Sequence, residues 1–283
     1  MKKVITIIIL TFAALAFFTA CFDIGEFNSE RYINVVSREA GSGTRGAFIE
    51  LVGMVVDGDD MTFRRATIAP GTNQVITSVA NNRYAIGYIT MGSLSERVRA
   101  LPIDGIYPNP ANVLNGSYPI YRPFYIAARR GESPLRDDFI DFILSYEGQA
   151  IVSEDYVAAI TNPTPFTGGG LNGTIVIVGS TAVAPVLTLL GEAFEARNPG
   201  VVVEVHPQGT TAGINQAIDR QIDIGMSSRP LTPAELAEIE AIAIAYDGLA
   251  VIVNNENPVM GLTLEDVRRI FTAEIMHWNL IAD

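Results

Sequence analysis

A loop of small residues between two arginines is the first place in this sequence where chemistry can be expected. The stretch reads REAGSGTRGAF over residues 38–48, after a strand-like run at 32–36 and before a helix-like run at 47–52. The first N–H groups of such a helix lack intrahelical partners, and they lie at the positive end of the helix dipole. Ser42 and Thr44 add hydroxyls, and Arg38 and Arg45 add guanidinium groups. This combination favours a bound oxyanion; a tight turn without a ligand is the alternative.

The same arrangement recurs three times in the second half of the chain. Small residues rich in Ser and Thr follow strand-like runs and precede helix-like runs in VGSTAVAP (178–185), QGTTAG (208–213) and IGMSSRP (224–230). The glycine spacing matches neither a P-loop nor a dinucleotide fingerprint, so nucleotide binding is disfavoured. Several such helix N-termini, converging at the carboxyl ends of strands, would enclose a small anion.

The elements that must position these loops alternate along the chain. Apolar runs predict strands at 84–89, 174–178, 201–205 and 249–253. Helical spacing predicts helices at 137–146, 185–197, 212–220 and 263–271. Strands alternating with helices indicate an α/β fold with largely parallel sheets.

Composition excludes several classes of function. The chain has 283 residues, 48% of them hydrophobic and 18% charged, and a net charge of -12, so a nucleic-acid partner is not expected. His206 and His277 are the two histidines, and there is a single cysteine, so no metal site, disulfide or cofactor is expected. No G-x-S-x-G elbow is present, and no convincing catalytic set is found, so an enzyme is not expected.

The N-terminus reads as a targeting segment. Residues 1–20 carry two lysines and then an apolar run, as in a signal peptide, and Phe-Thr-Ala precedes Cys21. Small residues before a lone cysteine predict a bacterial lipobox with lipid attachment at Cys21; an ordinary secretory signal with an incidental cysteine is the alternative. Residues 21–31 would be a polar tether. The expected location is the extracytoplasmic face of the cell membrane, held there by lipid.

The chain resembles the phosphate-binding receptors of bacterial phosphate ABC transporters. The matching stretches cover most of the chain after the signal: VSREAGSGTRGAF, AIGYITMGSL, YPIYRPF, IVGSTAVAPV, PQGTTAGINQAI, DIGMSSRPLTPAE, AYDGLAVIVNNENP and LTLEDVRRIFTAEIMHWNL. Each motif alone is weak, whereas the combination is specific to that family.

The resemblance implies a two-lobed flytrap of the type II periplasmic-binding-protein kind, each lobe a mostly parallel sheet flanked by helices. Dehydrated inorganic phosphate would be held between the lobes by hydrogen bonds and delivered to a membrane permease. From one lobe, the residues carried over are Arg38, Ser42, Gly43 and Thr44. From the other lobe, they are Thr181, the backbone of Ala182, Thr210 and Ser228.

One departure from the family concerns the acceptor for the phosphate proton. Some members carry an aspartate where this chain has Ser228. A buried carboxylate can accept that proton, and sulfate has none to give. Asp247 is the first candidate for the acceptor and Asp223 the second, although Asp223 also fits a structural cap. Without that aspartate, a receptor for another oxyanion such as sulfate or molybdate is the main alternative, and a sensor that kept the fold is another.

The second departure concerns the order of segments. The segment with Arg38 normally follows the one with Trp278 in this family, and here it precedes it. Residues 31–160 resemble the family's C-terminal part and residues 174–283 its N-terminal part, with a linker at 161–173. A circular permutation would give lobes of roughly 119–247 and 31–118 plus 248–283. A fragment of a longer tandem receptor is the competing interpretation.

Overall fold

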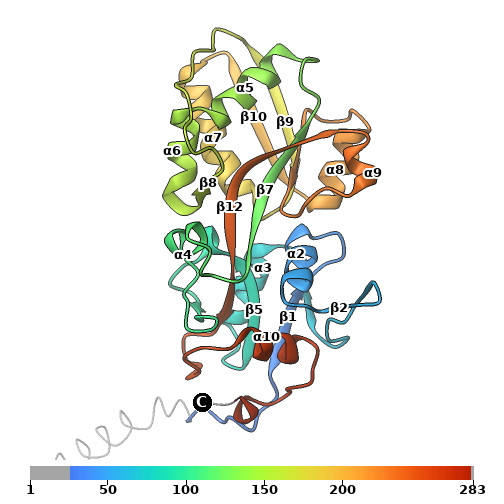
Figure 1. Ribbon diagram of the computed structural model, residues 1–283, viewed down its shortest axis with the longest axis vertical. Helices are drawn as coiled ribbons and strands as arrows, with labels where there is room; N and C mark the ends of the chain where they lie inside the picture. The colour runs from blue at the N-terminus through green and yellow to red at the C-terminus, as the bar shows by residue number, and fades with distance from the viewer. Residues whose placement is uncertain (1–25, 282–283) are drawn as a thin grey trace, which may run out of the picture.

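The computed structural model describes residues 26–281, which form two lobes placed one above the other (Figure 1). The lobes are joined by two long antiparallel strands that run through the middle of the molecule, β7 (Tyr121–Ala128) and β12 (Glu240–Val253). The lobes therefore share a hinge of two hydrogen-bonded strands.

The lower lobe contains the first part of the described chain and its end. Its elements are β1 (Asn34–Arg38), α2 (Gly43–Leu51), β2 (Val55–Val56), β3 (Asp59–Asp60), β4 (Thr67–Ala69), α3 (Thr72–Ala80), β5 (Ala85–Thr90), η1 (Met91–Ser93), β6 (Arg99–Ala100), α4 (Pro110–Leu114), α10 (Leu264–Phe271) and η2 (Trp278–Leu280).

The upper lobe is built from the middle of the chain. Besides β7 and the first part of β12, its elements are α5 (Pro134–Leu144), α6 (Tyr146–Asp155), β8 (Val157–Ala158), β9 (Gly173–Gly179), α7 (Ala184–Arg197), β10 (Val201–Pro207), α8 (Thr210–Ile218), β11 (Ile224–Ser227) and α9 (Pro233–Leu236).

A single curled sheet runs through both lobes in the order β10-β9-β11-β7-β12-β5-β1-β4. The outer strands of each lobe are parallel to one another, as βαβ connections require, whereas β7 and β12 are antiparallel to their neighbours. Strand β12 pairs with β7 as far as Gly248 and with β5 from Leu249 onward. The expected α/β fold is therefore confirmed, with a mixed sheet because the hinge strands are antiparallel.

The first helix begins earlier than its apolar pattern predicts. Helix α2 starts at Gly43, inside the small-residue loop, because Ser42 is its N-cap and its Oγ accepts a hydrogen bond from the backbone N of Arg45. On the buried side of this helix, Phe48 stacks on Tyr88 with ring centroids 3.8 Å apart. The hydroxyl of Tyr88 in turn accepts from the backbone N of Arg38 at 3.3 Å. Aromatic packing thus fixes the loop that carries the first arginine.

Residues 161–172 form an extended connection within the upper lobe, between β8 and β9. The backbone N of Tyr146 donates to the carbonyl of Thr164 at 2.8 Å, and the backbone N of Phe166 donates to Glu147 Oε2 at 2.9 Å. This segment is therefore held against the start of α6, within the upper lobe.

The two ends of the described chain lie side by side at the bottom of the lower lobe (Figure 1). The backbone N of Ile33 donates to the carbonyl of Met276 at 2.8 Å, and that of Asn279 donates to Ser29 at 2.9 Å. Trp278 is 3% exposed and belongs to the core there.

Candidate anion-binding site between the lobes

The first turn of α2 touches the opposite lobe. A Cβ atom placed on Gly43 would fall 2.8 Å from the Oγ of Ser228, and closer still to the Oγ1 of Thr210. No real side chain tolerates such contacts, so the glycine is required for this approach. The N-terminus of α2, with its unpaired N–H groups, therefore faces hydroxyls of the upper lobe.

Four buried hydroxyls surround this contact, with Ser228 at their centre. The Oγ of Ser180 donates to that of Ser228 at 2.8 Å, and the Oγ1 of Thr44 lies 3.5 Å from it. The backbone N of Ser228 donates to the Oγ1 of Thr210 at 3.3 Å. Each of the four side chains is at most 2% exposed. A hydroxyl can rotate to donate to a bound oxygen, so the cluster suits an oxyanion.

Arg38 supplies the positive charge beside these hydroxyls. It is 2% exposed, and its Nη2 donates to the Oγ1 of Thr181 across the interface at 3.1 Å. Its Nε and Nη2 also donate to both carboxylate oxygens of Glu39, at 2.8 and 2.7 Å. The Nη1 group makes no hydrogen bond with the residues that the structure describes. A buried guanidinium of this kind can bind an oxyanion strongly.

The helix ends add backbone donors to the same place. Helix α8 begins at Thr210, directly after Gly209, whose φ of 97° is in the region that favours glycine. Helix α7 begins at Ala184, and the backbone N of Ala182 in the preceding turn donates to Ser180 Oγ at 3.2 Å. Three helix N-termini, those of α2, α7 and α8, thus meet at the carboxyl ends of strands, where the helix dipoles favour an anion.

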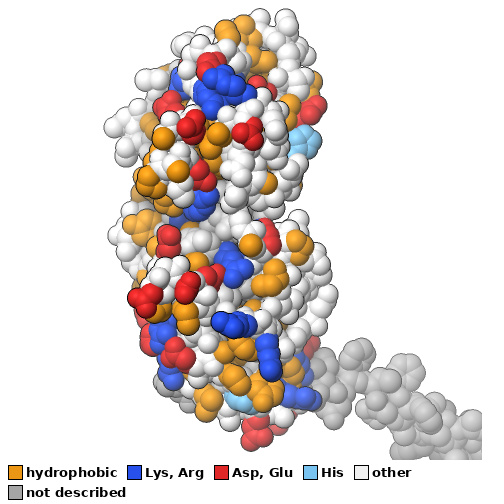
Figure 2. Space-filling model, turned by 90° about the vertical axis from the view of Figure 1, so that its right-hand side faces the viewer, with side chains coloured by type: hydrophobic (Ala, Val, Ile, Leu, Met, Phe, Trp, Pro, Cys, Tyr) orange, Lys and Arg blue, Asp and Glu red, His pale blue; other side chains and the backbone are white. Residues whose placement is uncertain are grey.

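A cleft of about 510 Å³ lies between α3 and α7, next to this cluster. Thr181 and Thr72 are part of its wall, and their Oγ1 atoms are 3.3 Å apart. Figure 2 shows that the molecule has a waist at the level where the two lobes meet. The cleft therefore reaches from solvent to Thr181, the residue whose Oγ1 accepts from Arg38.

A buried ion pair in the hinge supports the cluster from behind. Asp247 in β12 is directly opposite Arg122 in β7, and its Oδ2 accepts from Nη2 at 3.1 Å and Nε at 3.3 Å. Its Oδ1 accepts from Thr90 Oγ1 at 2.6 Å and from the backbone N of Met91 at 3.2 Å. Burial raises the pKa of Asp247 to about 6, and Arg122 and Thr90 oppose that rise.

Asp247 does not contact the hydroxyl cluster directly. The Nη1 of Arg122 donates to the backbone carbonyl of Ser228 at 2.9 Å, so the carboxylate is separated from the cluster by one arginine. Asp223 is further from it, because it precedes β11 while Ser228 follows that strand. Its Oδ2 accepts from the backbone N of Val176 at 2.8 Å, which is a structural role.

The structure brings together Arg38, Ser42, Gly43, Thr44, Thr181, Ala182, Thr210 and Ser228. Sequence reasoning missed four neighbours of this set, namely Glu39, Thr72, Ser180 and Arg122. Ser180 stands in a loop that the sequence singles out. Arg122 is an arginine inside an otherwise apolar strand pattern, YPIYRPF, and this was the available signal.

The remaining expectations concern other parts of the chain. Among residues 26–281, no group of His, Cys, Asp or Glu could hold a metal ion. His206 is exposed beside Glu204, and His277 lies against the backbone carbonyl of Glu30. The expected signal peptide, Cys21 and the first residues of the tether lie outside the described residues. Within those residues, no helix has the length and apolar character needed to cross a bilayer.

Two lobes joined by crossing strands, with anion-binding groups where they meet, define a binding protein of the periplasmic type. A family profile described as PBP superfamily domain matches residues 22–147 and 164–282. A solved phosphate-binding protein of a phosphate ABC transporter from Streptococcus pneumoniae TIGR4 is 41% identical. It covers 89% of this chain and 100% of its own, with a TM-score of 0.71.

Two relatives of known name show which family of periplasmic-type binding proteins the chain resembles. Phosphate-binding protein PstS 2 of Streptococcus pneumoniae TIGR4 is 41% identical over 254 residues, which are 88% of this chain and 87% of the relative. Phosphate-binding protein PstS 2 of Streptococcus agalactiae 2603 V/R is 40% identical over 266 residues, 92% and 91% of the two chains. The chain belongs to the PstS phosphate-binding protein family.

Proposed function

We propose that this chain is an extracytoplasmic receptor that captures inorganic phosphate between its lobes and delivers it to an ABC importer. The observation that carries the proposal is the meeting of Arg38, four buried hydroxyls and three helix N-termini at the lobe interface. Each group donates hydrogen bonds, and together they suit a small tetrahedral oxyanion. The family relatives are phosphate-binding proteins by name, which supports phosphate as that anion.

The residues proposed to bind phosphate are Arg38, Ser42, Gly43, Thr44, Thr181, Ala182, Thr210 and Ser228. They belong to both lobes, so binding and closure would be one event. Closure excludes water and strengthens each hydrogen bond to the anion. The closed form would be recognised by a membrane permease, and no bond of phosphate is made or broken. We further propose lipid attachment at Cys21, which places the receptor on the outer face of the cell membrane.

The acceptor for the phosphate proton is proposed to be Glu39. It is a carboxylate paired directly with Arg38, and its Oε1 lies 3.8 Å from the position of a Cβ on Gly209, at the N-terminus of α8. Asp247, favoured from the sequence, contacts Arg122, Thr90 and Met91 and is separated from the hydroxyl cluster by Arg122, whereas Glu39 pairs with Arg38, which reaches across the lobe interface. We therefore assign Asp247 a positioning role through Arg122.

We also propose that the two halves of the sequence are in swapped order relative to other phosphate-binding receptors, as a circular permutation that this chain shares with the PstS 2 relatives, which align with it in one stretch over 87% or more of their length. What supports this is the proximity of the two ends of the described chain, where residues 29–33 pair with 276–279. Permutation is tolerated where termini lie close together at the surface. The exposed connection at 161–172 would mark the original ends.

Titration calorimetry of the chain, stripped of bound ligand, tests the proposed function. We expect one-to-one binding of phosphate that excess sulfate does not displace. Arg38→Ala is expected to weaken phosphate binding by about 1.5–3 kcal/mol, the range for a hydrogen bond to a charged group. The matched control is Arg197→Ala, which removes an arginine that is 49% exposed on the upper lobe. A well-folded chain that binds sulfate instead, or neither anion, would reject the proposal.

A further inference from the structure

Four arginines with unpaired guanidinium groups occupy one end of the lower lobe. Within residues 26–281, the guanidinium groups of Arg31, Arg64, Arg65 and Arg269 make no hydrogen bond or ion pair, whereas every other arginine there has a partner. Arg31, Arg64 and Arg65 are exposed. In a chain with a net charge of -12, unpaired cations collected at one end are unexpected unless a negatively charged partner lies there.

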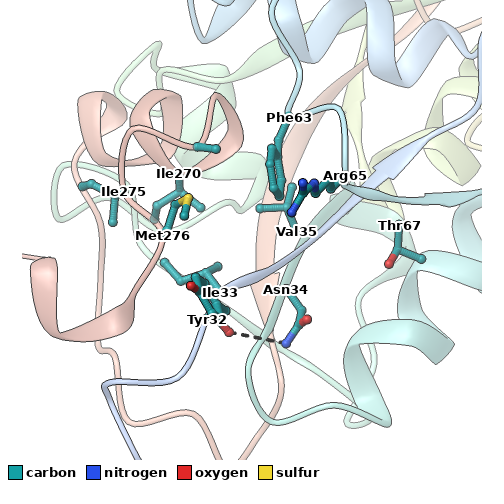
Figure 3. A pocket seen from close by; sticks show the side chains of 11 residues that line it. Tyr32, Ile33, Asn34, Val35, Phe63, Arg65, Thr67, Ile270, Ile275 and Met276 are labelled. Atoms are coloured by element: carbon teal, nitrogen blue, oxygen red, sulfur yellow. Dashed lines mark hydrogen bonds between the residues drawn. The ribbon is translucent and has the colours of Figure 1, made fainter.

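A half-apolar pocket of about 290 Å³, lined by Arg65, lies at this end of the lobe. Figure 3 shows Arg65 beside Phe63 and Val35, with Ile270, Ile275 and Met276 across the pocket and Tyr32 and Asn34 at its other edge. Arg65 lines this pocket, and Arg64 lines a neighbouring groove together with Arg65. Arg31 and Arg269 are the chain neighbours of Tyr32 and Ile270, which line the pocket. Figure 2 shows arginine, acidic and hydrophobic side chains mixed over the lower part of the molecule.

Large apolar side chains are exposed around the same pocket. Tyr32 is 62% exposed and Met276 38%, and both line the pocket. Tyr32 also stacks on His277, with ring centroids 4.4 Å apart, which holds the aromatic ring at the surface. Arginines mixed with aromatic and apolar side chains are the composition of surfaces that lie in the interface of a bilayer. Acids also stand here and offset part of the charge: Glu30 is next to Arg31, and Asp59 and Asp60 line a groove together with Arg64 and Arg65.

The sequence places this end of the molecule near the membrane. Only five residue steps separate Cys21, the proposed point of lipid attachment, from Glu26, where the described chain begins. Five extended residues span at most about 18 Å. Tyr32 and Ile33 line the pocket, and residues 29–33 pair with 276–279, so the pocket is held within a short reach of the anchor. Charges on a lobe tethered this closely can contact the headgroups directly.

We propose that the surface formed by Arg31, Arg64, Arg65, Arg269, Tyr32 and Met276, here called the basal surface, binds the headgroups of anionic phospholipids. The inference rests on the anchoring proposed for Cys21 and concerns a surface distant from the phosphate site. Bound in this way, the lower lobe stands on the membrane with the hinge upright, and the upper lobe remains free to close. Each arginine near an anionic surface strengthens binding by about fivefold.

The test uses the whole lipid-carrying chain, purified from membranes and placed in vesicles of phosphatidylcholine or of phosphatidylglycerol. Amide hydrogen exchange is measured at residues 62–67 and 272–277. We expect exchange there to slow by about fivefold or more in phosphatidylglycerol relative to phosphatidylcholine, and the difference to vanish in high salt. The anchor is present in both vesicles, so its contribution cancels.

Two triple variants that remove the same charge from different surfaces test whether the basal surface is responsible for the slowed exchange. Arg31→Gln, Arg64→Gln and Arg65→Gln together should weaken lipid binding by about a hundredfold and abolish the slowed exchange. The control variant carries Arg130→Gln, Arg197→Gln and Arg220→Gln, which remove the same charge from the upper lobe, where each arginine pairs with a surface acid. This variant should leave the slowed exchange unchanged. Equal exchange in the two lipids, or the same slowing in both triple variants, would overturn the proposal.

Two further readouts distinguish lipid binding from self-association and from loss of the phosphate site. Slowed exchange in detergent that grows with protein concentration would mean that a second copy covers the basal surface, which also overturns the proposal. Phosphate titration of the same samples should give equal affinity in both triple variants. If no sample binds phosphate but the lipid-dependent exchange is still observed, the proposed phosphate-binding function is refuted and the lipid-binding proposal stands.

Discussion

At the residue scale, Gly43 has the most constrained position in the binding site. Its Cα faces the hydroxyls of Thr210 and Ser228 so closely that no β-carbon fits while the lobes are together. We expect Gly43→Ala to hold the lobes apart and weaken phosphate binding by about 1–3 kcal/mol, the usual cost of overpacking, which is about 5- to 150-fold in affinity. Calorimetry gives the affinity, and small-angle scattering with saturating phosphate shows whether the lobes still close.

Gly46, one turn further along α2, is the control for this substitution. A Cβ there would meet only the Cδ of Arg229, at the ordinary distance of 3.6 Å. Gly46→Ala should leave phosphate affinity unchanged and should stabilise the helix by up to about 1 kcal/mol. Equal affinity in the two alanine variants would mean that the lobes do not meet at Gly43 when phosphate is bound.

Glu39 is the residue on which selectivity is expected to depend. Its carboxylate is 27% exposed and lies against Arg38, so it would face a bound anion. Glu39→Gln keeps the shape and removes the charge. Phosphate then loses a charged acceptor for its proton, and sulfate is no longer repelled, so we expect the ratio of phosphate to sulfate affinity to fall at least about tenfold, or ~1.4 kcal/mol.

Competition titrations with the two anions measure this ratio. Glu192→Gln, which makes the same charge change at an exposed position of α7, is the matched control and should leave the ratio unaltered. An unaltered ratio in Glu39→Gln as well would assign proton acceptance to another group.

At the scale of elements, the hinge strands β7 and β12 carry a buried pair whose ionisation should be visible in stability. The folded-state pKa of Asp247 is about 6, above its ordinary value of 3.8, because of burial. Between these values the folded chain holds a proton that the unfolded chain has released. Stability from this group is therefore present at about pH 4, falls as pH rises toward 6, and is level above it, a change on the order of 3 kcal/mol.

Urea unfolding of the native chain and of Asp247→Asn between pH 4 and 7 tests this prediction. The other titrating groups contribute equally to both free energies of unfolding, so their contributions cancel in the difference. Glu235, whose pKa is lowered to about 2 by Arg229, is one such group. The native chain should lose stability relative to the variant across the window from about 4 to 6. A flat difference, or a slope of the opposite sign, would contradict the raised pKa.

The elements also show what the sequence could and could not predict. The strand and helix patterns at 174–178 and 185–197 correspond to β9 and α7 within a few residues, because burial gives each a clear period. The small-residue loops were recognisable because capping and glycine chemistry are local. The pairing of Arg122 with Asp247 depends on strand register between segments 125 residues apart, which no local pattern reveals. The closeness of Glu39 to Gly209 likewise depends on how the lobes are placed.

At the scale of the whole molecule, the arrangement of the ends makes a strong prediction about chain order. Residues 29–33 and 276–279 are hydrogen-bonded neighbours, so joining residue 281 to residue 26 needs only a short loop. Opening the chain between Gly170 and Leu171 cuts an extended connection that contributes few backbone hydrogen bonds. The re-ordered chain, running from 171 to 281 and then from 26 to 170, would keep every strand pairing of the sheet.

We expect this re-ordered chain to fold, with a free energy of unfolding within about 1–2 kcal/mol of the native order, because loop closure varies slowly with loop length. Urea unfolding and phosphate titration measure the two quantities, and the affinity should be unchanged because both lobes and the hinge are intact. A second re-ordered chain, opened between Gly225 and Met226 in β11, breaks a strand flanked by β9 and β7 and should not fold. If both re-ordered chains fail equally, the native order is required by folding, and the halves are not interchangeable in the way that a circular permutation implies.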